Sequence, residues 1–391
     1  MKTEGYSVTL EVLTPVHVGS GDMVNALGYL REGETLYVVD PDRWNEWLSE
    51  QRAAERFIGW MDRILQTTSP QQQRQFSLTR FVREELRQND VRGVASQVSR
   101  YPIRMEECGE PDPLRGFRVH LRDAYARAYL PGSSLKGALR TALIEELLSQ
   151  DDQLEKALVK PLQTVKPTHD RRVLRRNLKR VWEEMEQSLL RGGQKKANFD
   201  LLRFVLVSDS EPFAHEQVSV RLVRSEGTQR RTDTWVEALR PGASTRLTLS
   251  LVPEAPLALL GLQEDLREYL LWEALMEVLY ERAKRRLQRE RQYPYPPAVQ
   301  QRLQELQQRN RPDAPLLCVG WGQGYLGTTV MGLVEETNAS RYAQLVEKMR
   351  PVLPRQGQGV QPQRFPKTRR AVRSAQQEAV APIGWVQLNA V

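Results

Sequence analysis

The sequence has 391 residues, of which 57 are Lys or Arg and 49 are Asp or Glu, and its net charge is +8. This length predicts two domains, because a single hydrophobic core rarely grows beyond ~250 residues. Two cysteines, Cys108 and Cys318, exclude a disulfide scaffold and a zinc site built from cysteine pairs. The N-terminal residues do not resemble a signal peptide, and no run of ~18 apolar residues occurs. We therefore expect a cytoplasmic protein that does not span a membrane.

The first half of the chain alternates predicted strands and helices. Apolar and polar residues alternate over residues 6–12, which predicts a half-buried strand, and residues 36–39 form a second short one. Helices are predicted over residues 44–65, 80–88 and 131–148. The last of these is the clearest, because its apolar residues recur at helical spacing. We expect Ser133 to be its N-cap.

The second half continues this mixture. A basic helical stretch is predicted over residues 154–190, and a long helix over residues 266–291. Strands are predicted at residues 202–207, 218–222, 247–251, 316–320 and 383–388. Strands interleaved with long helical insertions favour an α+β fold with helices on one face of the sheets. We predict two domains, residues 1–215 and 216–391.

Positive charge is concentrated in three zones. Residues 166–196 carry a net charge of +6, residues 282–311 carry +7 and residues 351–374 carry +6. These zones sum to +19, so the remainder of the chain carries −11. Arginine dominates, with 46 residues against 11 lysines. Since guanidinium groups bind phosphates and stack on bases, a nucleic-acid partner is the natural hypothesis; solvated helix faces or protein-docking surfaces are the alternatives.

The first motif follows the N-terminal strand, where residues 13–21 read Leu-Thr-Pro-Val-His-Val-Gly-Ser-Gly. Glycines permit positive φ angles and close backbone approach, and a serine hydroxyl with free amides can bind phosphate. A histidine in such a loop can stack on a base or donate to phosphate. The candidate RNA-binding residues are His17, Gly19, Ser20 and Gly21. The alternative is an ordinary glycine-rich turn with a structural histidine.

The second motif opens the helix at residues 131–148, with the sequence Pro-Gly-Ser-Ser-Leu-Lys-Gly-Ala-Leu-Arg. Free amides and serine hydroxyls at a helix N-terminus favour an anion. Lys136 and Arg140 are four residues apart and so share a helix face. The candidate residues are Gly132, Ser133, Ser134, Lys136 and Arg140. The alternative is a capped helix with solvated basic residues.

The third motif is a glycine-rich loop at residues 320–327, Gly-Trp-Gly-Gln-Gly-Tyr-Leu-Gly. Its glycines match G-x-G-x-x-G, but residues 328–330 read as strand, which argues against a dinucleotide site that would need a helix there. Glycines with two aromatic residues better suit a nucleic-acid strand whose bases stack on the rings. The candidate residues are Gly320, Trp321, Gly322, Gln323, Gly324 and Tyr325.

In this order, the three motifs resemble the RAMP superfamily of CRISPR-associated RNA-binding proteins. The segment Phe-Pro-Lys-Thr-Arg-Arg at residues 365–370 and the terminal Gly-Trp-Val at 384–386 extend the resemblance, within that superfamily, to the fifth, end-capping subunit of type III-A Csm effector complexes. The resemblance implies two RRM-like, ferredoxin-like RAMP domains with helical insertions. It also implies a non-catalytic, RNA-binding role in antiviral defence, near the 3′ end of the guide RNA.

The resemblance further implies the partners of the chain. They are guide (CRISPR) RNA, the neighbouring Csm backbone and small subunits, and host nucleases that trim the guide 3′ end. We expect neither a cofactor nor a metal.

Two alternative functions stay open. His17, paired with a residue such as Lys136, could cleave guide precursor as a RAMP-type endoribonuclease. A purely protein-docking role is the other, and it predicts no RNA affinity for the isolated chain.

Overall fold

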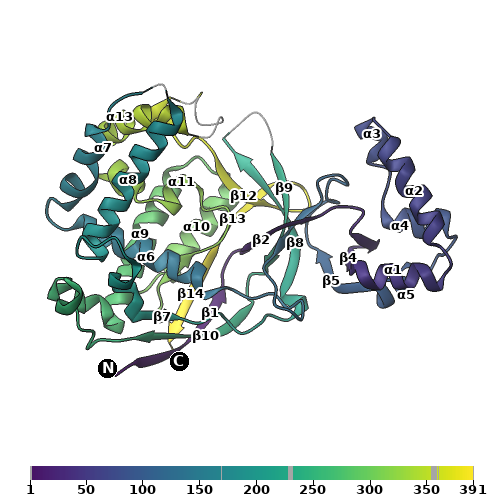
Figure 1. Ribbon diagram of the computed structural model, residues 1–391, viewed down its shortest axis with the longest axis horizontal. Helices are drawn as coiled ribbons and strands as arrows, with labels where there is room; N and C mark the ends of the chain where they lie inside the picture. The colour runs from purple at the N-terminus through teal and green to yellow at the C-terminus, as the bar shows by residue number, and fades with distance from the viewer. Residues whose placement is uncertain (1, 169, 228–231, 354–358, 360, 391) are drawn as a thin grey trace.

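The computed structural model describes residues 2–168, 170–227, 232–353, 359 and 361–390. The chain has a mixed α+β fold, as expected, with two sheets and a helical layer (Figure 1). No helix in these ranges is long and apolar enough to cross a membrane. Part of the basic zone at residues 351–374 lies outside the described residues.

The first sheet is antiparallel throughout and has five strands. In spatial order these are β11 (Leu316–Cys318), β14 (Trp385–Ala390), β1 (Glu4–Val12), β10 (Ser244–Leu251) and β7 (Val205–Val207). Two helices, α6 (Gly132–Ser149) and α9 (Trp272–Gln292), connect its strands. The order along the chain is therefore β1–α6–β7–β10–α9–β14, apart from the short edge strand β11. Because β1 pairs with β14, the two termini lie side by side (Figure 1).

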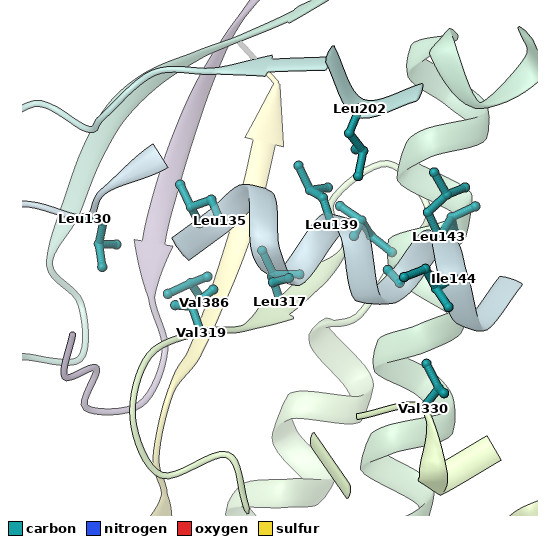
Figure 2. Close-up of a cluster of buried hydrophobic side chains, with 14 of the residues drawn as sticks. Leu130, Leu135, Leu139, Leu143, Ile144, Leu202, Leu317, Val319, Val330 and Val386 are labelled. Carbon is teal, nitrogen blue, oxygen red and sulfur yellow. The ribbon is translucent and has the colours of Figure 1, made fainter. Parts of the chain in front are cut away.

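The core of this half confirms the predicted apolar stripe of α6. Figure 2 shows Leu135, Leu139 and Leu143 of α6 in one cluster of buried side chains with Leu317 and Val386 of the sheet. All five side chains are at most 3% exposed, which fixes the rotation of α6 about its axis. The stripe also fixes which residues of α6 face away from the sheet, and these form part of the site described below.

The second sheet is larger and mixed. Its main path runs β2 (Gly19–Val24), β6 (Phe117–His120), β9 (Asp233–Leu239), β8 (Val218–Glu226), β5 (Ser99–Met105), β4 (Thr35–Val39) and β3 (Tyr29–Glu32). The strand β12 (Arg369–Arg373) pairs with β8 and with β13 (Ala379–Pro382). Both sheets combine strands from before and after residue 215, since β1 pairs with β10 and β5 pairs with β8. The division into domains at that residue stays a prediction.

A helical lobe projects from the β3–β4 edge of the second sheet (Figure 1). It consists of α1 (Pro41–Glu50), α2 (Ala54–Gln66), α3 (Pro70–Gln73), α4 (Leu78–Arg80), a π-helical turn (Phe81–Glu85) and α5 (Val91–Val98). Its own core is aromatic, with Trp44, Trp60 and Phe81 all buried. The single helix predicted over residues 44–65 is wrong, because Arg52 takes a positive φ of 51° and separates α1 from α2.

The remaining helices pack around the first sheet and α9. They are a π-helical turn (Leu154–Val159), α7 (Lys160–Thr164), α8 (Arg171–Leu190), α10 (Pro297–Arg309), α11 (Gly324–Thr328), α12 (Met331–Thr337) and α13 (Ala339–Met349). Three other segments differ from their predicted secondary structure. The segments 202–207 and 266–291 each begin with a 3-10 turn, Leu201–Phe204 and Glu264–Leu270. The strand predicted at residues 328–330 is wrong, because Thr328 ends α11 and the next two residues join α11 to α12.

The basic zone at residues 282–311 is largely neutralised by the fold. Seven of its nine basic side chains lie within 3.8 Å of a carboxylate. Several of those carboxylates come from distant segments, such as Glu11 of β1, which meets Arg309. Charge counted along the sequence therefore overstates the positive surface of this zone.

Candidate nucleic-acid interface

The three sequence motifs meet at one open cleft of about 540 Å³. The first motif enters it from the loop before β2, the second from one side of α6, and the third from the loop between β11 and α11. The lining residues are His17, Val18, Gly19, Gly21, Arg118, Ser134, Gly137, Ala138, Thr141, Arg282, Gly320, Trp321, Gln323, Gly327 and Thr328. Segments more than 300 residues apart thus form one surface.

His17 is held in a defined orientation at the floor of this cleft. Its side chain is 1% exposed, and Nδ1 donates to the Glu237 carbonyl at 2.6 Å. Nε2 is left with its lone pair and faces Gly19, where an added Cβ would approach it to 3.0 Å. Burial lowers the pKa of His17 to about 4, so the imidazole is neutral at pH 7.

A buried network lies behind His17. The Glu237 carboxylate accepts from the Tyr101 hydroxyl at 2.8 Å, from the His120 backbone N–H at 2.9 Å and from the Arg122 guanidinium at 3.1 Å. His120 accepts from Val18 N–H through Nδ1 and donates to the Tyr129 carbonyl through Nε2. Both ring nitrogens of His120 are therefore occupied. Burial lowers the pKa of His120 to about 3, so it too is neutral at pH 7.

Close packing of backbone fixes the third motif against the first. The backbone N–H of Trp321 donates to the backbone carbonyl of His17 at 2.7 Å. Gly320 has a φ of +77°, and a Cβ there would lie 2.3 Å from the same carbonyl oxygen. Gly322 has a φ of +103°, and a Cβ would lie 2.4 Å from the Ile383 side chain. These two glycines are needed for conformation and space, which is a structural role.

Two buried arginines of α9 attach this loop to α6. Arg282 donates to the Ala138 carbonyl at 3.2 Å and to the Gly327 carbonyl at 3.0 Å, and its Nε lies 3.3 Å from a Glu145 carboxylate oxygen. Arg286 donates to the Gln323 side-chain oxygen at 2.8 Å. The second and third motifs are therefore joined by buried guanidinium groups, of which that of Arg282 also lines the cleft.

The N-terminus of α6 is capped differently from the prediction. Pro131 is the N-cap residue, and the Gly132 N–H donates to Asp209 at 2.7 Å. Ser133 as the N-cap is wrong, because it already lies inside the helix, and the carboxylate that binds this end comes from 77 residues away. A Cβ on Gly132 would meet the Val207 carbonyl at 2.3 Å, so this glycine allows α6 to approach β7 closely.

Trp321 lines the cleft and contacts two arginines, of which Arg118 also lines it. The Arg370 guanidinium carbon is 4.1 Å from the ring centroid, and that of Arg118 is 5.3 Å from it. The His17 ring meets Trp321 edge-on at 6.0 Å. The cleft therefore combines cationic side chains, a serine hydroxyl and exposed glycine backbone, a set that suits a phosphodiester backbone. A neutral His17 whose Nδ1–H is already donated offers a proton acceptor but no charged acid.

Comparison with known families decides the class of the protein. The RAMP superfamily model matches residues 9–295, which is more than half of the chain. The chain belongs to the RAMP superfamily. Among RAMP proteins, it is 26% identical over 220 residues to a protein named CRISPR system Cms protein Csm5 from Streptococcus thermophilus, a match covering 54% of this chain and 53% of that protein. A Csm5 from Enterococcus italicus is 26% identical over 154 residues, covering 35% and 42%. The matches thus span about half the length of these curated relatives, or less.

Two solved structures match over nearly the full length of the chain. One chain of a cryo-EM structure titled as a Csm–crRNA–target RNA ternary complex of a type III-A CRISPR-Cas system has a TM-score of 0.71 at 22% identity, covering 98% of this chain and all of that one. The crystal structure of T. onnurineus Csm5 has a TM-score of 0.68 at 20% identity, covering 97% and 99%. The chain is therefore a RAMP protein with a Csm5-like fold.

About half of the candidate residues line the cleft where the three motifs meet. The lining includes His17, Gly19, Gly21, Ser134, Gly320, Trp321 and Gln323. It does not include Ser20, Gly132, Ser133, Lys136, Arg140, Gly322, Gly324 or Tyr325. The role of any of them in RNA binding stays a prediction, but the two sets differ in what their side chains can reach.

Two candidates are engaged by partners inside the protein. Tyr325 packs edge-on against Phe365 with centroids 5.1 Å apart, and it contacts the main core. Its ring is not an open stacking platform, because it lies at the first turn of α11 and faces inward. Arg140 donates to Asp200 at 2.9 Å and also pairs with Glu186. Its charge is therefore compensated within the protein, unlike that of Lys136, which has no carboxylate within salt-bridge distance among the described residues.

Sequence reasoning missed several lining residues. Gly137 and Thr141 lie on α6 one and two turns after Ser134, and helical periodicity alone could have placed them on the same face. Arg118 and Arg282 carried no local signal, since their positions at the cleft depend on strand pairing and helix packing. Arg370 was within a recognised segment but was not assigned to the site.

Proposed function

We propose that this chain is a Csm5-type, non-catalytic subunit of a type III-A CRISPR effector ribonucleoprotein. In this proposal it binds guide RNA through the three-motif cleft and caps the backbone of the complex near the guide 3′ end. Its partners would be the guide RNA, the neighbouring Csm backbone and small subunits, and nucleases that trim the guide. It would thereby support guide maturation and complex assembly in antiviral defence within the cytoplasm.

The single observation that carries the proposal is the convergence of three distant motifs on one cleft in a RAMP fold. A second support is the match to a chain from a cryo-EM structure of a Csm–crRNA–target RNA complex. The non-catalytic assignment is supported by the chemistry of His17, because its pKa of about 4 and its donated Nδ1–H leave no charged acid at that position.

The finer architecture belongs to the same proposal. The first sheet has the chain order of a β-α-β-β-α-β unit, with β14, β1, β10 and β7 side by side. That is the arrangement of a ferredoxin-like domain, the fold expected for RRM-like RNA-binding modules. We propose that this unit is one RAMP domain and that the second sheet is a divergent second one.

The decisive experiment places a negative charge in the cleft without disturbing the fold. Gly137 lies in α6, lines the cleft, and has open space where a Cβ would be added. Glutamate also has a higher helix propensity than glycine by about 0.5–1 kcal/mol. Gly137→Glu should therefore fold at least as stably as the wild type. It should weaken RNA binding by more than tenfold, because the carboxylate repels phosphate.

Gly59 provides a matched control. It is an exposed helical glycine with open space for a Cβ, and it lies in α2 of the distant helical lobe. Gly59→Glu adds the same charge and should bind RNA as the wild type does. The assay is fluorescence anisotropy with labelled single-stranded guide RNA, followed by reconstitution with the other Csm subunits and sequencing of the bound RNA. Equal affinity of both variants would contradict the proposed cleft.

The nuclease alternative is tested with the same protein. Labelled guide precursor is incubated with and without magnesium, using the wild type and His17→Ala. The proposal expects intact precursor throughout. Cleavage by the wild type that disappears in the variant would overturn the non-catalytic assignment.

A further inference from the structure

Two arginines near the cleft differ from their neighbours in having no anionic partner. Within the described residues, Arg118 and Arg370 form no hydrogen bond or ion pair through their side chains. Both lie over the ring of Trp321, at 5.3 Å and 4.1 Å from its centroid. They come from β6 and β12, so only the tertiary structure brings them to one indole.

The neighbouring arginines show how unusual this is. Arg369, adjacent in β12, has its Nε 3.2 Å from Glu290, and Arg122, four residues after Arg118, binds the buried Glu237. Successive residues of a strand point to opposite faces, so Arg369 meets a carboxylate on one face while Arg370 meets Trp321 on the other. The fold compensates the surrounding cations and leaves these two without an anion.

The two guanidinium groups also repel each other. Partial burial, and secondarily the charge of Arg118, lower the pKa of Arg370. Guanidinium remains charged at neutral pH despite such a shift. Two like charges held beside one aromatic ring, without a carboxylate, are stabilised when an external anion binds between or beside them.

We propose that Arg118, Trp321 and Arg370 form a phosphate subsite of the cleft that binds the sugar–phosphate backbone of single-stranded RNA, with Trp321 holding the arginines instead of stacking on a base. This inference rests on the proposed RNA-binding function and assigns a specific role within it. The ring of Trp321 is already covered by Arg370 at 4.1 Å and met edge-on by His17, which leaves less of it for a base. Cation–π contact with the indole ring fixes the orientation of both guanidinium groups at little conformational cost. The subsite would therefore recognise the sugar–phosphate backbone of the RNA and would not distinguish one base from another.

The salt dependence of RNA binding tests the subsite directly. For single strands, the slope of log K against log salt changes by about 0.7 for each phosphate that the protein no longer neutralises. The double variant Arg118→Ala plus Arg370→Ala, which removes two cations, should therefore show a slope less steep by about 1.4. The charge-matched control is Arg56→Ala plus Arg92→Ala, on exposed positions of α2 and α5 in the helical lobe, which should keep the wild-type slope.

An abasic probe separates phosphate binding from base stacking. The full-length chain is titrated with a labelled single-stranded RNA and with an RNA of the same length whose central nucleotides lack bases. The subsite predicts that the double arginine variant and Trp321→Ala each weaken binding of both RNAs by the same factor. If Trp321→Ala weakens binding only to the intact RNA, Trp321 is a base platform and the proposal is overturned.

The remaining outcomes distinguish the subsite from the function on which it rests. If the double arginine variant keeps the wild-type slope while Gly137→Glu loses affinity, the cleft binds RNA without this subsite. If the wild type binds neither RNA and Gly137→Glu behaves identically, the RNA-binding function itself fails. A slope lowered by about 1.4 with unchanged behaviour of the control variant supports both.

Discussion

The buried pair of Arg282 and Glu145 should be among the most sensitive points of the fold. Arg282 of α9 is 6% exposed and Glu145 of α6 is 5% exposed, and Arg282 also donates to the carbonyls of Ala138 and Gly327. Arg282→Met removes the charge but keeps an unbranched side chain. It leaves a buried carboxylate without its cation, and removing one partner of a buried pair typically costs about 3–5 kcal/mol. We therefore expect a loss of about 3–5 kcal/mol in the free energy of unfolding.

The double variant Arg282→Met plus Glu145→Leu distinguishes this reasoning from simple loss of packing. With both charges gone, no ion is buried alone, so more than half of the lost stability should return. Lys284→Met is a matched control, because Lys284 lies on the same helix and its contacts with Glu281 and the Tyr280 ring are at the surface, so the unfolding midpoint should hardly move. The measurement is equilibrium urea unfolding followed by tryptophan fluorescence and circular dichroism. A single variant within about 1 kcal/mol of the wild type, or a double variant no more stable than the single, would refute the argument.

Three further predictions follow from the same structure. Gly320→Ala should destabilise the protein by at least about 3 kcal/mol, because the new Cβ would meet a backbone carbonyl at 2.3 Å, whereas Gly324→Ala, at a φ of +73° but with open space, should cost about 1 kcal/mol; urea unfolding of both variants checks this. Burial lowers the pKa of His17 to about 4 and that of His120 to about 3, from 6.5, so their contribution to stability is complete above pH 6.5 and is lost as pH falls toward 4 and 3. Each should add a slope of up to about 1.4 kcal/mol per pH unit between pH 6 and 5, and a double His→Gln variant that loses as much stability as the wild type over that interval would contradict it. Trp60→Ala should cost about 3–5 kcal/mol within the aromatic core of the helical lobe and expose that lobe to limited proteolysis, while RNA affinity stays unchanged, since no residue of α1–α5 lines the cleft; loss of affinity would be the contrary result.

Much of the secondary structure was predictable because its causes are local. The alternation over residues 6–12 became β1, and the leucine stripe after Pro131 became α6 with its stripe buried. The wrong predictions concern short segments whose local sequence is misleading, because residues far away in the chain decide their conformation. The segment 328–330 has strand-like residues, yet it forms the end of α11 and the connection to α12, where Val330 is buried in the main core. Ser133 suits an N-cap, yet Asp209 binds that helix end.

The candidate site was predictable as a set of motifs but only in part as a set of contacts. Seven of the assigned residues line the cleft, while the Tyr325 ring and the Arg140 charge are directed to partners inside the protein. Composition identified an arginine-rich chain. It could not tell a compensated guanidinium from an uncompensated one, because carboxylates such as Glu145 and Glu11 are more than 100 residues from the arginines that they neutralise.

By itself, the sequence determined most of the strands and helices, the three glycine- and serine-rich loops, and the resemblance to RAMP proteins. Hydrophobic period and turn chemistry act between neighbours in the chain. Only the tertiary structure decided that these loops share one cleft, that Arg282 reaches it and that Arg118 and Arg370 meet at Trp321. The physical reason is that strand pairing and helix packing set distances between segments up to hundreds of residues apart. The spacing of residues along a chain does not encode those distances.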